Sequence, residues 1–326
     1  MTGVLRADAP GPLVTLQDVG RPGWRRFGIS GCGAMDVSAL ELANVLVGNQ
    51  PHEAALEFAQ FGGVWEILAD SCRIAVTGGD FGVAVDGIPL APWRSHTVWR
   101  GQRLAIRTAR DAVWGYLAVA GGFAAPPQLG SLATHVRSRI GGIDGNRIAA
   151  GDELALRATA VPDGPERRID PPYHADGALR VVLGPQEDYF SRETIDAFLA
   201  SRYRVSHRSD RMGTWLEGPP VAHARGFNVL SDGLVPGCVQ VPGTGQPVVV
   251  MKDCQTIGGY PKLATLVTAD LARFAQTRPG REVRFAALDV AAAQDVHRAA
   301  WTDREARLAA VEAIEAPGTR PFWLRR

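Results

Sequence analysis

The sequence has few of the features that mark membrane, secreted or zinc-binding proteins. No apolar run approaches the roughly 18 residues that span a bilayer, and the first residues lack the basic and apolar regions of a secretory signal. The four cysteines, at positions 32, 72, 238 and 254, form no CxxC pair, as expected where thiols stay reduced. These absences predict a cytoplasmic chain with no zinc site and no disulfide framework.

Neither sign of charge is in excess. The chain has 35 basic and 34 acidic residues, a net charge of +1, whereas binding to a phosphate backbone relies on a basic field. Nucleic acid is therefore not an expected partner. Hydrophobic residues make up 46% of the 326, which is enough for a core, and a domain takes about 150 residues. The length predicts two domains.

Lysine is nearly absent from this sequence. Only Lys252 and Lys262 occur, beside 33 arginines, and both lie in the segment MKDCQTIGGYPK (251–262). Lysine offers a compact ammonium on a flexible stem, which the rigid guanidinium fork of arginine cannot reproduce. The segment is therefore a candidate site, although two solvated surface lysines are the alternative interpretation.

The short motifs of common nucleotide, metal and hydrolase sites are missing as well. GCGAMD (31–36) and GTGQPV (243–248) begin like a dinucleotide fingerprint but lack its third glycine. The sequence contains no GxxxxGK(S/T) loop, no HExxH pair and no GxSxG elbow. No metal is expected. If ATP takes part in the reaction, another surface or another chain must bind it.

Glycine and proline, the residues typical of turns, occur along the whole chain. Its 37 glycines and 22 prolines separate short apolar runs such as RIAVTG and WGYLAVAGG. This pattern indicates strands that follow one another through turns, and we predict closed or nearly closed β-barrels. Three helices are expected, at 36–47, 191–203 and 268–276. Asp36 is the expected cap of the first helix, and Gly48 its expected end.

Composition also suggests where the domains begin and end. Residues 158–177 hold four prolines and no periodic apolar face, which is typical of a linker. We therefore place a first β-barrel domain at 1–160, a linker at 161–177 and a second β-barrel domain at 178–288. The remaining 289–326 are rich in alanine and charge and predict a helical tail that packs on the body or on a partner. Its expected apolar face comprises Val296, Ala300, Leu308, Val311 and Ile314.

Polar side chains gather in glycine-rich turns of the second half, in SDRM (209–212), LSDG (230–233), VQVPGTGQP (239–247) and KDCQTIGGYPK (252–262). Glutamines and backbone N–H groups can recognise an amide, a lysine or arginine can bind a carboxylate, and an aspartate can accept a proton. This set suits a small amide or carboxylate substrate. Asp232 is interpreted as the cap of its own turn. The other candidates are Asp210, Arg211, Gln240, Asp253, Gln255, Tyr260 and Lys262.

Several segments together carry a family pattern. They include VTLQDVGRPG (14–23), GAMDVSALELANVLVGN (33–49), SDRMGTWLEGPP (209–220) and the whole of 230–262. With them the chain resembles the biotin-dependent carboxyltransferase-like proteins, a family that includes the C subunit of 5-oxoprolinase, allophanate hydrolase subunit 2 and the carboxyltransferase domain of urea carboxylase. The tail after 288 lies outside the resemblance.

The resemblance implies a mainly β fold of two cyclophilin-like β-barrel domains, with a few short helices and the substrate cleft between the barrels. Relatives of this length are similar to the C subunit of a bacterial ATP-dependent 5-oxoprolinase. That complex opens the lactam of 5-oxo-L-proline to L-glutamate with the help of subunits A and B. The resemblance thus implies an amide hydrolase subunit that acts with partners, and ATP that the complex binds.

The family pattern also implies site residues. In the first half it carries over onto Asp18, Arg21, Asp36, Glu57 and Asp80. In the second half it carries over onto Arg211, Gln240, Gln255 and Tyr260 for substrate binding, with Asp210, Asp253 and Lys262 as the catalytic candidates. Lys262 and the N–H groups of Gly258 and Gly259 are expected to stabilise an oxyanion. Asp210 or Asp253 would orient or deprotonate the substrate nitrogen.

Two other functions fit the same resemblance. One is transfer of a carboxylate from carboxybiotin to urea or a related amide. It needs biotin on a separate carrier, because this chain has no Met-Lys-Met turn. The other is a non-enzymatic module that antagonises a kinase inhibitor. The identity of the neighbouring genes would separate the three functions.

Overall fold

The computed structural model describes residues 3–161, 164–172 and 176–314. The chain folds into two compact units. Unit 1 comprises Met1–Val19, Val37–Pro172 and Ala306–Arg326, and unit 2 comprises Gly20–Asp36 and Tyr173–Glu305. Residues 20–36, which the sequence analysis assigned to the first domain, therefore pack with the second unit.

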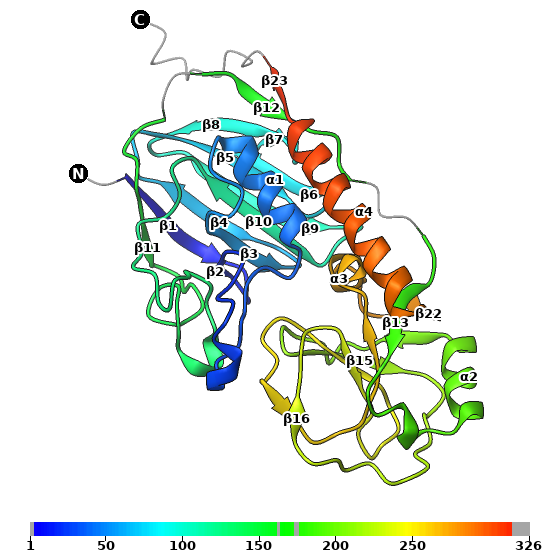
Figure 1. Cartoon of the computed structure of the whole chain (residues 1–326). Coiled ribbons are helices and arrows are strands. Elements are labelled where there is room, and N and C mark those ends of the chain that lie inside the picture. Colours follow the sequence, from blue (N-terminus) through cyan, green and yellow to red (C-terminus); the bar gives the residue numbers. More distant parts are fainter. Residues whose placement is uncertain (1–2, 162–163, 173–175, 315–326) are drawn as a thin grey trace, which may run out of the picture. The chain divides into compact units, whose positions relative to one another are not determined.

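Unit 1 is built on two antiparallel sheets (Figure 1). The first has the strand order β11 (Glu153–Leu156), β1 (Gly3–Pro10), β4 (Gly63–Ile67), β9 (Arg103–Ala109), β6 (Phe81–Val85) and β7 (Ile88–Leu90). The second has the order β2 (Thr15–Gln17), β3 (Ala55–Ala59), β10 (Trp114–Val119), β5 (Ser71–Thr77) and β8 (Ser95–Trp99). Most of these neighbours are far apart in sequence, so the sheets depend on long-range pairing.

The burial pattern of the strands explains where the core of unit 1 lies. In β1, Leu5 and Ala7 are buried while Val4 and Arg6 are half-buried, the alternation of a sheet with one face on the core. Every residue of β5 and β10 is buried instead. Helix α1 (Val37–Val47) packs across these two strands and covers their second face (Figure 1).

Helix α1 confirms the helix predicted at 36–47. Leu40, Ala43 and Val47, the three residues of its predicted apolar face, are all buried. Gly48 follows with a φ of +89°. This left-handed conformation ends a helix and is readily adopted only by glycine.

Unit 2 is built on one eight-stranded sheet. Its order is β21 (Glu282–Val283), β14 (Tyr203–Val205), β15 (Gly213–Glu217), β18 (Val248–Val250), β17 (Cys238–Gln240), β20 (Lys262–Leu266), β13 (Leu179–Leu183) and β22 (Phe285–Ala287). The two edge strands, β21 and β22, are separated in the chain only by Arg284. Because its edges lie one residue apart, the sheet is a nearly closed barrel, as predicted. A separate ribbon pairs β16 (Asp232–Gly233) with β19 (Ile257–Gly258).

Two helices accompany this barrel. Helix α2 (Arg192–Ala200) begins after Ser191, whose side chain accepts a hydrogen bond from the Thr194 N–H. The predicted helix 191–203 extends three residues too far at its C-terminal end, because Tyr203 is buried in the sheet as the first residue of β14. Helix α3 (Thr268–Ala275) confirms the third prediction. Short 3-10 turns are η1 (Arg25–Phe27), η2 (Val136–Ser138) and η3 (Glu187–Tyr189).

The predicted tail contains helix α4 (Val290–Ala309) and then strand β23 (Glu312–Ile314). All five residues of its predicted apolar face are half-buried, but Val311 and Ile314 lie beyond the helix. β23 pairs with β12 (Glu166–Arg168), which lies inside the predicted linker. Residues 315–326 of the predicted tail lie outside the described residues. The fold class is confirmed as mainly β with few helices and a C-terminal helix.

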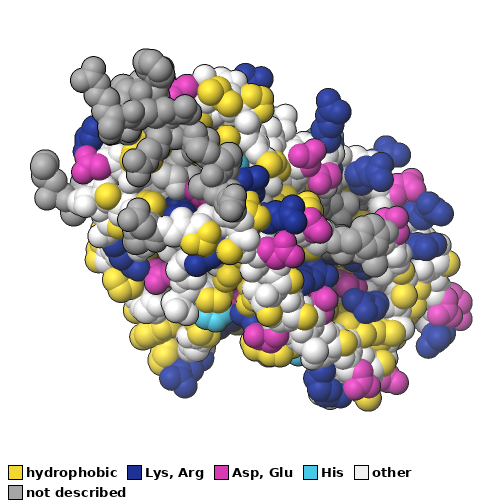
Figure 2. All heavy atoms as spheres, turned by 90° about the horizontal axis from the view of Figure 1, so that it is seen from above, with side chains coloured by type: hydrophobic (Ala, Val, Ile, Leu, Met, Phe, Trp, Pro, Cys, Tyr) yellow, Lys and Arg dark blue, Asp and Glu magenta, His cyan; other side chains and the backbone are white. Residues whose placement is uncertain are grey.

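The surface agrees with the balanced charge of the sequence. On the face in Figure 2, lysine and arginine side chains are interspersed with aspartate and glutamate. Among the described residues, no helix has both the length and the apolar character that crossing a membrane requires.

Candidate functional site

Lys262 is the centre of a polar cluster in unit 2. It is the first residue of β20, and it lies opposite Gln240 on β17. Both residues are only 4% exposed, and an ammonium is rarely buried unless it is paired. We call Gln186, Asp232, Gln240 and Lys262 the lysine cluster.

The partners of the ammonium come from β16. Lys262 Nζ donates to Asp232 Oδ2 at 2.5 Å and to the Gly233 carbonyl oxygen at 2.8 Å. The Asp232 carboxylate also accepts from the Gly233 N–H at 2.7 Å and from Gln186 Nε2 at 3.0 Å. Lys262, with help from these two amide donors, lowers the pKa of Asp232 to about 2. The carboxylate is therefore ionised at neutral pH.

Gln186 joins the two charged residues of the cluster. Its Oε1 accepts from the Lys262 backbone N–H at 3.1 Å, while its Nε2 donates to Asp232. The sequence analysis missed Gln186 because this contact spans 76 positions and no local motif marks it. The turn-cap interpretation of Asp232 is correct for its bond with Gly233 but overlooked its pairing with Lys262.

A glycine brings the main chain close to the cluster. A Cβ at Gly258 would lie 2.7 Å from Leu234 Cδ1 and 2.8 Å from Gln240 Nε2, so a side chain there would displace both neighbours. Gln240 Nε2 donates to the Tyr260 carbonyl oxygen at 3.3 Å, and the Tyr260 residue is 42% exposed. The structure thus brings together four predicted residues, Gln240, Gly258, Tyr260 and Lys262.

Arg211 and Asp253 form a second group. Arg211 Nε and Nη2 donate to the two carboxylate oxygens of Asp253 at 2.9 and 2.8 Å. Nη2 also donates to the Gly33 carbonyl oxygen at 2.8 Å. The side chains of the pair are 11% and 10% exposed. The pair fastens the start of β15 to the turn at Asp253 and to the segment 20–36, which gives Asp253 a structural role.

Asp210, Gln255 and Gly259 have other local roles. Asp210 Oδ1 accepts from the N–H groups of Met212 and Gly213 at 2.8 and 3.1 Å, so Asp210 caps its own turn. The Gln255 side chain is exposed, and its carbonyl oxygen accepts from Arg25 Nη2 at 3.0 Å. Gly259 accepts a bond from the Val229 N–H through its carbonyl oxygen at 3.0 Å. Catalysis by Asp210 stays a prediction.

Arg25 is a further residue that the sequence analysis missed. Besides Gln255, its Nη2 donates to the Leu234 carbonyl oxygen and contacts Cys254 Sγ at 3.7 Å. It thereby joins the two chain segments that flank the β16–β19 ribbon. These contacts span more than 200 positions in sequence, 209 for Leu234, so no motif could reveal them.

For three of the five residues predicted in the first half, Asp18, Glu57 and Asp36, the structure shows hydrogen-bond partners of the side chain. Asp18 accepts from Ser131 Oγ and the Leu132 N–H, both at 2.7 Å. Glu57 Oε2 accepts from the Tyr116 hydroxyl at 2.8 Å inside unit 1, and Asp80 is exposed there. In unit 2, Asp36 Oδ2 accepts from Gln276 Nε2 at 3.0 Å, and Arg21 is 1% exposed. Substrate contact by these residues stays a prediction.

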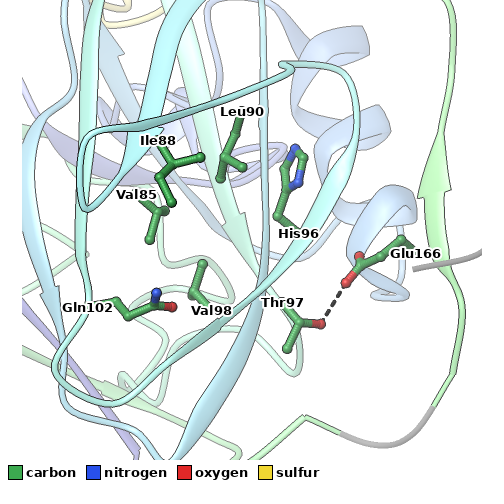
Figure 3. Close-up of a pocket in the computed structure, with 8 residues that line it drawn as sticks. All are labelled: Val85, Ile88, Leu90, His96, Thr97, Val98, Gln102 and Glu166. Atoms are coloured by element: carbon green, nitrogen blue, oxygen red, sulfur yellow. Dashed lines mark hydrogen bonds between the residues drawn. The ribbon is translucent and has the colours of Figure 1, made fainter. Parts of the chain in front are cut away.

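Unit 1 contains a cavity of about 100 Å³ that is lined by residues of β6 and β7 in its first sheet and of β8 in its second (Figure 3). Four of its eight lining residues are aliphatic, and Glu166 lies at one end, where it accepts from Thr97 Oγ1 at 2.6 Å. His96 also lines the cavity, and burial lowers its pKa. The full lining is Val85, Ile88, Leu90, His96, Thr97, Val98, Gln102 and Glu166. None of the predicted site residues lines this cavity.

No set of side chains suited to a metal was found in the described part of the chain. Within residues 3–161, 164–172 and 176–314, no three or more His, Cys, Asp or Glu side chains are grouped so that they could bind a metal ion. The four cysteines are free and buried.

Comparison with known protein families gives a match over most of the chain. A family profile described as "Carboxyltransferase domain, subdomain A and B" matches residues 27–287. The chain belongs to this carboxyltransferase-domain family. The resemblance found in the sequence is thereby confirmed, and the matched region includes all of the lysine cluster.

Individual relatives agree with this family. The chain is 38% identical over 290 residues to the C subunit of the Escherichia coli 5-oxoprolinase, covering 87% of this chain and 90% of that protein. It is 36% identical over 284 residues to the C subunit of the Haemophilus influenzae 5-oxoprolinase, with 87% and 91% covered. The urea amidolyase of Lachancea kluyveri is 28% identical over 333 residues, but only 18% of that protein is covered.

Solved structures of other proteins share the fold. A crystal structure of TTHA0988 matches with a TM-score of 0.79 and 36% identity, over 87% of this chain and 56% of that chain. The urea carboxylase of Kluyveromyces lactis matches with a TM-score of 0.85 and 26% identity, over 94% of this chain and 29% of that chain. The chain therefore spans about half, or less, of the length of these solved proteins.

Proposed function

We propose that this chain is the C subunit of an ATP-dependent 5-oxoprolinase complex and helps to open the lactam of 5-oxo-L-proline to L-glutamate. The observation that carries the proposal is the 38% identity to the C subunit of a 5-oxoprolinase, with 90% of that protein covered. A match that covers 90% of a separate subunit favours this function over that of a domain inside a larger enzyme.

The lysine cluster supports the proposal on chemical grounds. Opening a lactam adds water across the C–N bond. Negative charge develops on the carbonyl oxygen when water attacks the carbonyl carbon, and it is lost when the C–N bond breaks and the nitrogen takes up a proton. A fixed donor aimed at such an oxygen is worth about 3–4 kcal/mol. An ammonium has three N–H donors, and Asp232 and Gly233 take two of those of Lys262. In this proposal Lys262 donates to the substrate, and the Gln240 amide helps to orient the ring.

The other components of the reaction come from partners in this proposal. Subunits A and B are the expected partners, because the relatives are named as one subunit of a larger enzyme. The sequence contains no P-loop, so we assign ATP to the complex rather than to this chain. We place the complex in the cytoplasm, since four free cysteines suit a reducing compartment.

A second candidate is carboxyl transfer from biotin to urea or a related amide. It is favoured by the relatives named urea amidolyase and by the likeness to urea carboxylase, with a TM-score of 0.85. These proteins are much longer than this chain, and the match covers 18% and 29% of them. The same cluster of a lysine and amide groups would then bind urea.

One experiment separates the two candidates. The chain is co-purified with the products of its neighbouring genes, and the complex is assayed for ATP-dependent release of glutamate from 5-oxo-L-proline. A parallel assay supplies urea, bicarbonate, ATP and a biotinylated carrier. Glutamate release that requires both ATP and this chain supports the proposal, whereas carboxylation of urea without glutamate release refutes it.

A further inference from the structure

The ammonium of Lys262 is covered by a carboxylate that is itself exposed. The Lys262 side chain is 5% exposed and the Asp232 side chain is 54% exposed. Asp232 therefore lies on the solvent side of the contact, with its Oδ2 2.5 Å from Nζ. A ligand that approaches the ammonium from this side meets Asp232 first.

The surroundings of Asp232 form a receptor for a carboxylate. Three kinds of donor converge on it, namely the Lys262 ammonium, the Gln186 side-chain amide and the Gly233 backbone N–H. Charge-assisted bonds of this kind are about twice as strong as neutral ones. The ammonium and the Gln186 amide belong to other segments of the chain, so they would receive another carboxylate as well as that of Asp232.

Exchange of one carboxylate for another keeps the buried ammonium of Lys262 paired with an anion. Removing the partner of a buried charge is strongly destabilising, so Lys262 needs an anion at every stage. An incoming carboxylate would replace Asp232 without leaving the ammonium unpaired. Asp232 sits on the two-residue strand β16 and is already half in water, and no atom lies within 4 Å of a Cβ built on Gly233. The displaced segment has room to move.

We propose that Asp232 occupies the position of the substrate's carboxylate, and that an acidic substrate exchanges with it on Lys262. The inference rests on the proposed function and narrows its substrate class to lactams or amides that carry a carboxylate. 5-Oxo-L-proline has this group beside its ring, whereas urea has none. Asp232 is then a specificity-determining residue, because it excludes neutral amides that cannot replace it.

The scarcity of lysine makes it possible to measure the accessibility of Lys262 directly. Lys252 and Lys262 are the two lysines of the chain, so mass spectrometry after mild acetylation reports on each separately, with Lys252 as the internal reference. The probes are 5-oxo-L-proline, cyclopentanecarboxylate and 2-pyrrolidinone, which separate the carboxylate from the lactam. In the assembled complex we expect 5-oxo-L-proline and, more weakly, cyclopentanecarboxylate to slow acetylation of Lys262. 2-Pyrrolidinone at the same concentration should leave it unchanged.

The substitution Asp232→Asn tests the exchange itself. Asparagine keeps the shape but removes the competing charge, so we expect 5-oxo-L-proline to protect Lys262 at a concentration at least fivefold lower than in the wild type. Asp196→Asn is the matched control, since Asp196 is 55% exposed and pairs with Arg192 on α2. Gln186→Leu provides a second variant: it removes a donor that either carboxylate would use, so we expect it to shift this concentration by less than about twofold.

The outcomes distinguish this inference from the proposed function. If Asp232→Asn weakens protection or leaves it unchanged, Asp232 is a substrate contact or a structural residue and the inference is wrong. It is also wrong if no carboxylate protects Lys262 in any variant. If carboxylates protect Lys262 more tightly in Asp232→Asn but the complex releases no glutamate, the exchange stands and the proposed function fails.

Discussion

Replacing Asp253 by asparagine should destabilise unit 2 rather than remove a catalytic base. The substitution leaves the Arg211 guanidinium without the charge that accepts two of its N–H groups, at 2.9 and 2.8 Å. The two side chains are 11% and 10% exposed, so little water can replace the carboxylate. Removing one member of a buried pair costs about 3–5 kcal/mol, and we expect the lower figure, about 3 kcal/mol, because the pair is not fully buried.

A matched pair on the surface provides the control. Arg225 Nη1 donates to Asp188 Oδ2 at 2.6 Å, but these side chains are 64% and 52% exposed. Exposed pairs contribute about 0.2–1 kcal/mol, so Asp188→Asn should change the free energy of unfolding by about 0.5 kcal/mol. The exposed pair has the shorter distance, so a larger loss in Asp253→Asn can be attributed to burial.

Urea unfolding and hydrogen exchange measure the difference. The Asp253 N–H donates to the Arg211 carbonyl oxygen at 2.8 Å, and the Met251 N–H donates to that of Met212 at 2.9 Å. We expect both amides to exchange faster in Asp253→Asn and to be unchanged in Asp188→Asn. Equal unfolding energies for the two variants would refute the reasoning. A stable Asp253→Asn variant without turnover would instead support the prediction that Asp253 is a catalytic residue.

Two further predictions concern packing and thiol reactivity. Gly258→Ala should lower the free energy of unfolding by about 1–3 kcal/mol, because its Cβ would lie 2.7 Å from Leu234 Cδ1, whereas Gly233→Ala meets no atom within 4 Å. Equal melting temperatures for these variants would contradict the close approach at Gly258. Burial raises the pKa of both Cys32 and Cys72 to about 12, so at pH 8 only about one thiol in ten thousand is ionised. Iodoacetamide should therefore modify both residues in urea but not in the native protein, and rapid native modification would refute their burial.

Most of the helices could be predicted from the sequence, because an apolar face and the residues that end a helix lie within a few positions of one another. The helix over 36–47 follows from an apolar face and from Gly48, and it forms as Val37–Val47. The linker prediction failed to anticipate β12 because the partner strand, β23, lies more than 140 positions away, with Arg168 opposite Glu312. A strand of three residues in a proline-rich segment has no periodicity of its own to detect.

The candidate site was predicted only in part for the same reason. Lys262 and Gln240 stood out by residue type, and pairing of β17 with β20 places them side by side. Their partners Gln186 and Asp232 come from segments 76 and 30 positions from Lys262, so only the folded barrel reveals them. Asp210 and Asp232 both follow a serine in a turn, yet Asp210 only caps its own turn whereas Asp232 also pairs with Lys262. The local sequence does not distinguish these two roles.

Turnover of the assembled complex with Lys262→Ala tests the central claim most directly. The claim is that the buried ammonium of Lys262 acts on the substrate, and Lys252→Ala controls for the loss of a lysine elsewhere in the same segment. We expect Lys262→Ala to lower ATP-dependent glutamate release at least tenfold, in line with the few kcal/mol of a fixed donor, while Lys252→Ala leaves it unchanged. Unaltered release by a well-folded Lys262→Ala complex would contradict the account.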